Sequence, residues 1–155
     1  MWNCKKSVGL SLFVCWFLSA VLLVLLFIGP WVFTLYMTEY RGFDVDGDPL
    51  MNIKTTFAAC FYPSAVFGGI IFYGLIKLLN NIKSGNIFIE QNPKLLRGVS
   101  WSCFAIGAIT FAGGFFYMPF MFVALAGGFV GMLLRVLKNV MQSAVEIQNE
   151  NDLTI

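Results

Sequence analysis

The residues best suited to chemistry are three aspartates that alternate with other residues, Asp44, Asp46 and Asp48. Carboxylates at this spacing open the calcium-binding loop of the EF-hand. The pattern fails further along, because Pro49 stands where that loop needs a glycine and Thr55 stands where it needs a bidentate glutamate. These three aspartates are therefore only weak candidates for a metal site. We expect a solvated acidic turn without a bound metal.

Other catalytic groups are scarce in the chain. It has no histidine, which removes the commonest general base and a common metal ligand. The four cysteines show no CxxC spacing, and Cys15, Cys60 and Cys103 stand in apolar stretches where a thiol behaves as a small hydrophobic group. No pair of carboxylates stands in a stretch that would line a cleft. We therefore expect no enzyme activity, no catalytic residue and no cofactor.

The chain carries too little charge to cover a surface that faces water. Of its 155 residues, 59% are hydrophobic and 12% are charged, whereas soluble domains contain about 25% charged residues. We expect lipid to cover most of the surface, so the lipid bilayer is the first predicted partner. The net charge of +2 is too small and too scattered to indicate direct nucleic-acid binding.

Three uncharged stretches are long enough to cross a bilayer. Residues 7–38 and 55–76 would form helices of about 48 Å and 33 Å, against a hydrocarbon thickness of about 30 Å. Residues 98–134 would form a helix of about 55 Å, which is too long for one crossing. We expect two spans here, with a break near residues 115–120, where Pro119 interrupts the stretch.

These stretches predict an all-α protein, an integral membrane four-helix bundle that forms a single domain over residues 1–155. Gly29 and Pro30 permit a kink or a stop late in the first span. Gly85 is placed to end a helix, and Asn92 with the following proline is placed to cap and begin the next one. The predicted spans are residues 8–36, 55–77, 97–117 and 119–141, with an outer loop at 38–54, an inner loop at 78–96 and a tail at 142–155.

The basic residues predict how the protein lies in the membrane. With four spans, eight of them fall on the side of both chain ends and only Arg41 and Lys54 fall on the other side. Because cytoplasmic loops carry the excess of Lys and Arg, we expect the N- and C-termini in the cytoplasm of a cell-membrane protein. The eight are Lys5, Lys6, Lys77, Lys83, Lys94, Arg97, Arg135 and Lys138.

Small residues recur every four positions in the third and fourth spans, which lets helix backbones approach closely in lipid. We expect these residues to pack helices within one chain, since a four-span chain supplies its own partners. A contact between two copies, giving a homo-oligomer, is the alternative. The residues are Ala108, Ala112, Ala124, Gly127, Gly128 and Gly131.

Two segments that should face the cytosol contain apolar residues. Ile87, Phe88 and Ile89 stand between polar neighbours in the inner loop, and the chain ends in Leu153, Thr154 and Ile155. Exposed apolar residues dock either on the protein's own helix ends and the lipid headgroups or on a partner. Both outcomes are open from the sequence, and these six residues are the candidate contacts for a partner.

The same segments carry a family resemblance. The run from Lys83 to Phe88, followed by Asn92, Leu96 and Arg97, together with the chain end from Glu150 to Ile155, resembles a family of small bacterial membrane proteins with four spans. That family is classed as a domain of unknown function. Its members are often encoded beside a small helix-turn-helix transcription regulator. The resemblance therefore implies a cytosolic regulator of this kind as a partner and implies no catalytic residues.

The function that these observations favour is that of a non-enzymatic multi-pass membrane protein, acting as a membrane partner or sensor for a cytosolic transcription regulator. A small transporter or channel subunit is one alternative, and a structural subunit of a membrane complex is another. The uncharged stretches that cross the hydrocarbon, residues 7–38, 55–76 and 98–134, contain no Asp, Glu, Lys, Arg or His, although such residues usually line proton and ion pathways. This absence argues against transport that is coupled to charge.

Overall fold

The computed structural model describes residues 4–42 and 48–152, and within these the side chains of residues 6–42 and 53–151. The described residues form four α-helices and no strand, so the all-α prediction is confirmed. The helices are α1 (Cys4–Glu39), α2 (Asp48–Lys83), α3 (Gln91–Gly114) and α4 (Pro119–Asp152).

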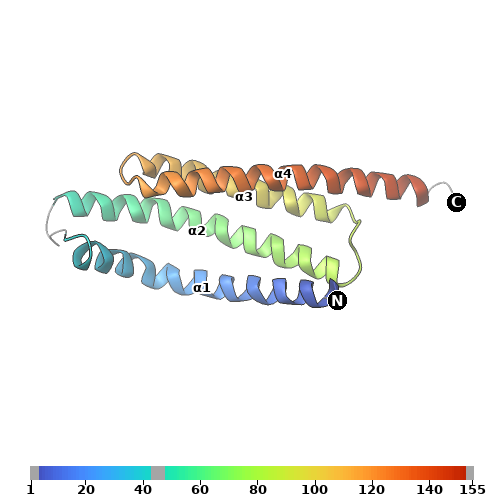
Figure 1. The fold of residues 1–155 in the computed structure, drawn as a ribbon, viewed down its shortest axis with the longest axis horizontal. Helices are drawn as coiled ribbons and strands as arrows, with labels where there is room; N and C mark the ends of the chain where they lie inside the picture. The colour runs from blue at the N-terminus through green and yellow to red at the C-terminus, as the bar shows by residue number, and fades with distance from the viewer. Residues whose placement is uncertain (1–3, 43–47, 153–155) are drawn as a thin grey trace.

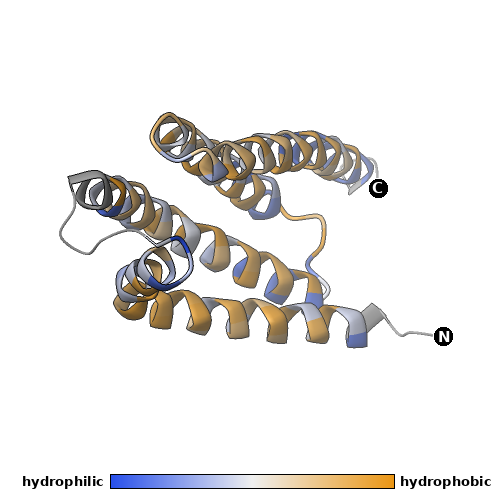
Figure 2. Ribbon diagram, turned by 60° about the vertical axis from the view of Figure 1, so that its left-hand side comes forward, coloured by the Kyte–Doolittle hydropathy of each residue, from blue (hydrophilic) through white to orange (hydrophobic). Residues whose placement is uncertain are grey.

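Each helix contains a stretch long and apolar enough to cross a membrane. The shortest, α3, has 24 residues, and at about 1.5 Å per residue it still exceeds a hydrocarbon core of about 30 Å. Figure 2 shows that hydrophobic residues cover the helices for most of their length and that hydrophilic residues gather near their ends. The chain is therefore built to lie in lipid with only its helix ends and connections in water.

Three helices run further than the sequence indicated. α2 begins at Asp48, so residues 48–54 of the predicted outer loop are helical. Pro30 does not end α1, which continues to Glu39, and the hydroxyl of Thr34 donates a hydrogen bond of 2.9 Å to the carbonyl oxygen of Pro30. Residues 142–152 of the predicted tail belong to α4. This segment contains no glycine or proline, and the Gln142 amide bonds the Glu146 carboxylate one turn later at 3.0 Å, which favours continued helix. Residues 142–152 therefore extend α4.

The helices form an open row rather than a closed bundle. Each helix packs on its neighbours in the chain, α1 on α2, α2 on α3 and α3 on α4, and in the described residues no other pair of helices comes into close backbone contact (Figure 1). Consequently α1 buries the smallest fraction of its apolar stretch. The lack of contact between α1 and α4 is the main departure from the predicted four-helix bundle.

An aromatic cluster links helices whose backbones stay apart. Phe57 of α2 stacks on Phe33 of α1 with ring centroids 4.0 Å apart, and it lies 6.3 Å from the ring of Phe120 of α4. Tyr117, in the connection between α3 and α4, meets Phe33 edge to face at 6.2 Å. Aromatic pairs at such distances add about 0.5–1.5 kcal/mol each beyond the area that they bury. This cluster therefore holds α1 to the rest of the row at one end.

The contact between α3 and α4 is made through glycines. A Cβ atom added at Gly127 would lie 3.2 Å from the backbone oxygen of Cys103 and 3.4 Å from the Cα of Gly107. The buried hydroxyl of Ser100 donates a hydrogen bond of 2.8 Å to the carbonyl oxygen of Gly131 on the facing helix. The two backbones are thus too close to accommodate a side chain between them.

The six small residues singled out in the sequence divide into two groups. Ala124, Gly127 and Gly131 contact α3 within this chain or are buried against it. In contrast, Ala108 and Ala112 are exposed, and a Cβ atom at Gly128 would meet no atom within 4 Å. The first group packs the chain internally, and the second group faces outward.

We predict that Gly127→Leu destabilises the protein, because its new side chain meets backbone atoms of α3 that cannot move aside. Overpacking of this kind typically costs about 1–3 kcal/mol. The measurement is thermal unfolding of the full chain in detergent, with Gly69→Leu as the control, since a Cβ atom at Gly69 meets nothing within 4 Å. An unchanged melting temperature for Gly127→Leu with a loss of dimer mass would contradict packing within one chain.

Candidate interaction surface at the loop end

One end of the molecule gathers the start of α1, the connection between α2 and α3, and the end of α4 (Figure 1). We call it the loop end, after the connection formed by residues 84–90. The predicted excess of basic residues falls on the helix segments next to this end, including Lys83, Lys94, Arg97 and Lys138. The candidate partner residues Ile87, Phe88 and Ile89 also lie in this connection.

The connection starts with a tight turn at Gly85. Its φ angle of +84° lies in the left-handed region, which a glycine adopts without steric cost. Two backbone hydrogen bonds close the end of α2. The Gly85 N–H donates to the carbonyl oxygen of Ile82 at 3.1 Å, and the Asn86 N–H donates to the carbonyl oxygen of Asn81 at 3.0 Å. This is the Schellman arrangement for ending a helix, and Gly85 ends α2 as the sequence indicated.

Asn92 fixes the remainder of the connection. Its side chain is fully buried, and its amide nitrogen donates to the carbonyl oxygens of Asn86 at 3.0 Å and Ile87 at 2.7 Å. Its amide oxygen accepts a bond of 2.8 Å from the side chain of Asn81 on α2. Both donor hydrogens and one acceptor site of this amide are therefore used. The loop backbone is tied to both helices that it joins.

The prediction that Asn92 caps α3 is wrong. The helix begins earlier, at Gln91, and Glu90 occupies the cap position without a side-chain hydrogen bond. The side chain of Asn92 instead points back to the loop, where its amide donates to the carbonyl oxygens of residues 86 and 87. A buried amide needs hydrogen-bond partners, and these carbonyl oxygens supply them. The role of Asn92 is to hold the preceding loop, which spacing alone does not reveal.

The loop held in this way exposes apolar side chains. Phe88 is 47% exposed and Ile87 is 39% exposed, whereas Ile89 is partly buried. Phe88 thus keeps about half of its surface free although it lies in a fixed turn. The exposed half of Phe88 is therefore available for contact with a lipid headgroup or another protein.

The other predicted contact residues, Leu153, Thr154 and Ile155, lie outside the described residues. On the described part of α4, Ile147 is 60% exposed and was not singled out in the sequence. It continues an outward apolar line through Val136 and Val140, at helical spacing. That spacing was the signal that could have identified Ile147, had the tail been taken as helix.

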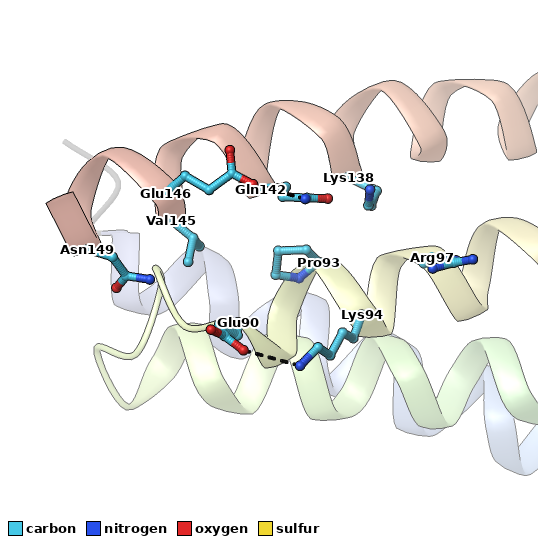
Figure 3. Close-up of a pocket in the computed structure, with 9 residues that line it drawn as sticks. All are labelled: Glu90, Pro93, Lys94, Arg97, Lys138, Gln142, Val145, Glu146 and Asn149. Atoms are coloured by element: carbon cyan, nitrogen blue, oxygen red, sulfur yellow. Dashed lines mark hydrogen bonds and ion pairs between the residues drawn. The ribbon is translucent and has the colours of Figure 1, made fainter.

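A cavity of about 300 Å³ separates the start of α3 from the end of α4 at the loop end (Figure 3). Glu90 and Lys94 face each other on its floor at 3.2 Å, but this ion pair is exposed and contributes at most about 1 kcal/mol. Pro93 and Val145 supply its apolar lining, and both are buried. The cavity therefore combines charged, polar and apolar side chains.

The described residues contain no group of three or more His, Cys, Asp or Glu side chains that could hold a metal ion. Asp44 and Asp46 lie outside the described residues, and Asp48 begins α2 with its side chain outside them. The acidic turn that the sequence offered as a weak calcium candidate therefore stays a sequence prediction.

Residues 8–155 match the family model described as "Protein of unknown function (DUF2975)". The chain belongs to this family. No curated protein and no solved structure matches it. The family membership expected from the run Lys83 to Phe88 and from Asn92, Leu96 and Arg97 is thereby confirmed. In this member of the family, Asn92 holds the loop formed by that run, and Leu96 is buried in the core at 1% exposure.

We predict that Asn92→Ala releases the loop. The substitution leaves the carbonyl oxygens of Asn86 and Ile87 and the amide of Asn81 without their partner, which costs about 1–3 kcal/mol. Amide hydrogen exchange of residues 86–89 should accelerate, as measured by mass spectrometry. Asn80→Ala is the matched control, because the Asn80 side chain is exposed. Equal exchange in both variants would show that Asn92 does not hold the loop.

Proposed function

We propose that this chain is a non-enzymatic multi-pass membrane protein that binds a cytosolic protein at its loop end. The observation that carries the proposal is the exposure of Ile87 and Phe88 on a loop that Asn92 and Asn81 hold in place. A fixed apolar group loses little conformational entropy when a partner covers it.

The charge distribution supports a cytoplasmic position for the loop end. Of seven basic residues with described side chains, six belong to the half of each helix that approaches this end and Arg135 stands at the midpoint of α4, whereas Arg41 and Lys54 lie toward the opposite end. By the positive-inside rule, the loop end faces the cytoplasm and the connection between α1 and α2 faces outward. The seven are Lys6, Lys77, Lys83, Lys94, Arg97, Arg135 and Lys138.

The family resemblance makes a small helix-turn-helix transcription regulator the first candidate partner. DNA-binding proteins carry basic surfaces. The last turns of α4 carry Glu146 and Glu150 beside the exposed Ile147, so this helix end combines negative charge with an apolar group. Such a surface complements a basic protein with an apolar patch. The membrane protein would then tether the regulator away from DNA without touching DNA itself.

Transport and catalysis have less support. In α3 the buried hydroxyls of Ser100, Ser102 and Thr110 each donate to a backbone carbonyl, at 2.8, 3.0 and 2.8 Å. Hydroxyls used in this way stabilise helix contacts and do not line a polar path. A transporter subunit, a channel subunit or a structural subunit of a larger complex therefore remains only an alternative.

We predict that Phe88→Ala combined with removal of residues 151–155 lowers capture of the cytosolic partner at least tenfold. Loss of one central aromatic contact is worth about 2 kcal/mol or more at an interface. The measurement is crosslinking in native membranes followed by mass spectrometry, with a melting curve of the same variant in detergent. Phe116→Ala is the control, because Phe116 lies at the opposite end and is more exposed than Phe88, at 72% against 47%.

A captured helix-turn-helix regulator that is lost in the double change and kept in the control supports the proposal. Capture of a transporter in its place favours the alternative of a membrane-complex subunit. A lower melting temperature with an unchanged capture profile would mean that Phe88 packs against its own protein. That result would contradict a partner site at this loop.

A further inference from the structure

A second cavity, of about 270 Å³, lies next to the loop end on the face shared by α3 and α4. Three of its six lining residues are cations, Arg97, Arg135 and Lys138, and none is acidic. None of these three cations pairs with an acidic side chain of the described residues. Glu90 and Glu146 line the first cavity together with Arg97 and Lys138, but their carboxylates accept hydrogen bonds there from Lys94 and Gln142. The second cavity therefore concentrates positive charge, and no acidic side chain among the described residues lines it.

An aromatic ring holds one of the cations in place. The guanidinium of Arg135 on α4 lies 5.3 Å from the centre of the Trp101 ring on α3, within range of a cation–π interaction. This contact spans the two helices and orients Arg135 into the cavity. Figure 3 shows Arg97 and Lys138 on these same two helices, on the side of the first cavity that lies away from the loop end. Like charges brought together in this manner favour an anion between them.

The depth of the cavity matches a lipid headgroup. Residues 98–134 are uncharged, so Arg97 precedes and Arg135 follows the stretch that lies in hydrocarbon. Their charged groups therefore stand at the boundary between lipid and water, where tryptophan is also enriched. Basic pockets between membrane helices at this level bind phosphate-containing headgroups.

An apolar groove of about 540 Å³ continues from this cavity along the same face. Its floor includes Gly107, Ala108, Ala124 and Gly128, whose small size keeps it open. The ring of Phe104, in its wall, meets the ring of Trp101 edge to face at 6.2 Å, so the basic cavity and the groove share a border.

Helical spacing aligns the two parts. Arg97, Trp101, Phe104, Ala108 and Phe111 follow one another at intervals of four, three, four and three residues, which places them on one face of α3. On α4 the groove runs from Met121 to Met132, about 16 Å at about 1.5 Å per residue, which is half of a hydrocarbon core of about 30 Å. Its length is therefore that of the acyl chains in one leaflet.

We propose that this face of α3 and α4 binds an anionic phospholipid, with the phosphate group between Arg97, Arg135 and Lys138 and an acyl chain along the groove. A free phosphate would satisfy the cations but leave the groove empty. A second copy of the chain, inserted with the same topology, would bring its own three cations to the same depth and be repelled. Only a lipid with a negative headgroup matches both parts.

The test uses the full chain, stripped of lipid in detergent. Phosphatidylglycerol, phosphatidylcholine and inorganic phosphate are added separately, and binding is measured by native mass spectrometry and by the shift in melting temperature. We expect phosphatidylglycerol to bind at least tenfold more tightly than phosphatidylcholine. The double change R97Q with R135Q should remove this preference, since each basic residue at the surface strengthens anionic-lipid binding severalfold.

Two control variants separate the site from general attraction to charge. K6Q with K83Q removes two exposed cations near the loop end and should keep the preference. Gly128→Leu fills the groove and should weaken phosphatidylglycerol binding at least severalfold while the basic cavity is intact. If R97Q with R135Q is poorly folded, R135Q alone serves, because its side chain is exposed.

Three results would overturn the proposal. The first is equal loss of preference in both double changes, which would mean diffuse electrostatics. The second is inorganic phosphate binding as tightly as phosphatidylglycerol, which would mean that the ligand is a free anion. The third is a dimer that Gly128→Leu dissociates without any effect on lipid binding, which would make the groove an interface between copies. None of these results depends on a protein partner at residues 84–90.

Discussion

The close approach of α3 and α4 is the constraint on which the rest of the structure depends. In lipid, apolar helices gain little by leaving hydrocarbon, so their association relies on close packing and hydrogen bonds between backbones and side chains. Gly107 and Gly127 allow the close packing, and the hydrogen bond from the Ser100 hydroxyl to the Gly131 carbonyl oxygen joins the two helices. This pairing sets α3 and α4 side by side, and it thereby creates both cavities and the groove between them.

The remaining helices are attached less tightly, which determines where the functional surfaces lie. α1 contacts α2 alone through its backbone and joins the rest through the aromatic cluster around Phe57. The apolar faces along the row suit lipid, so specific polar chemistry is left to the helix ends. At the loop end, Asn92 converts a short connection into a fixed platform for Ile87 and Phe88. Beside it, α4 extends into water with Ile147 on its surface.

Much of the fold could be predicted from local signals. Uncharged stretches revealed four helices, and Gly85 marked the end of α2 because a left-handed turn needs a glycine. The open arrangement could not be predicted, since it depends on which faces of the helices meet, and small residues such as Ala108 and Gly127 look alike in sequence. The role of Asn92 was missed because its partners are backbone carbonyls of a loop whose path was unknown. The basic cavity could not be predicted either, because Arg97 and Arg135 are far apart in the sequence and meet only when α3 packs on α4.

The central claim, that a held loop presents Phe88 to a cytosolic protein, is tested most directly by placing a photoreactive amino acid at position 88 in the full chain. After illumination of intact cells, the adducts are identified by mass spectrometry and compared with those from position 116 at the opposite end. The account predicts a covalent adduct between position 88 and a cytosolic protein, which is absent for position 116. Adducts from position 88 with lipid alone, or with proteins outside the cytoplasm, would contradict it.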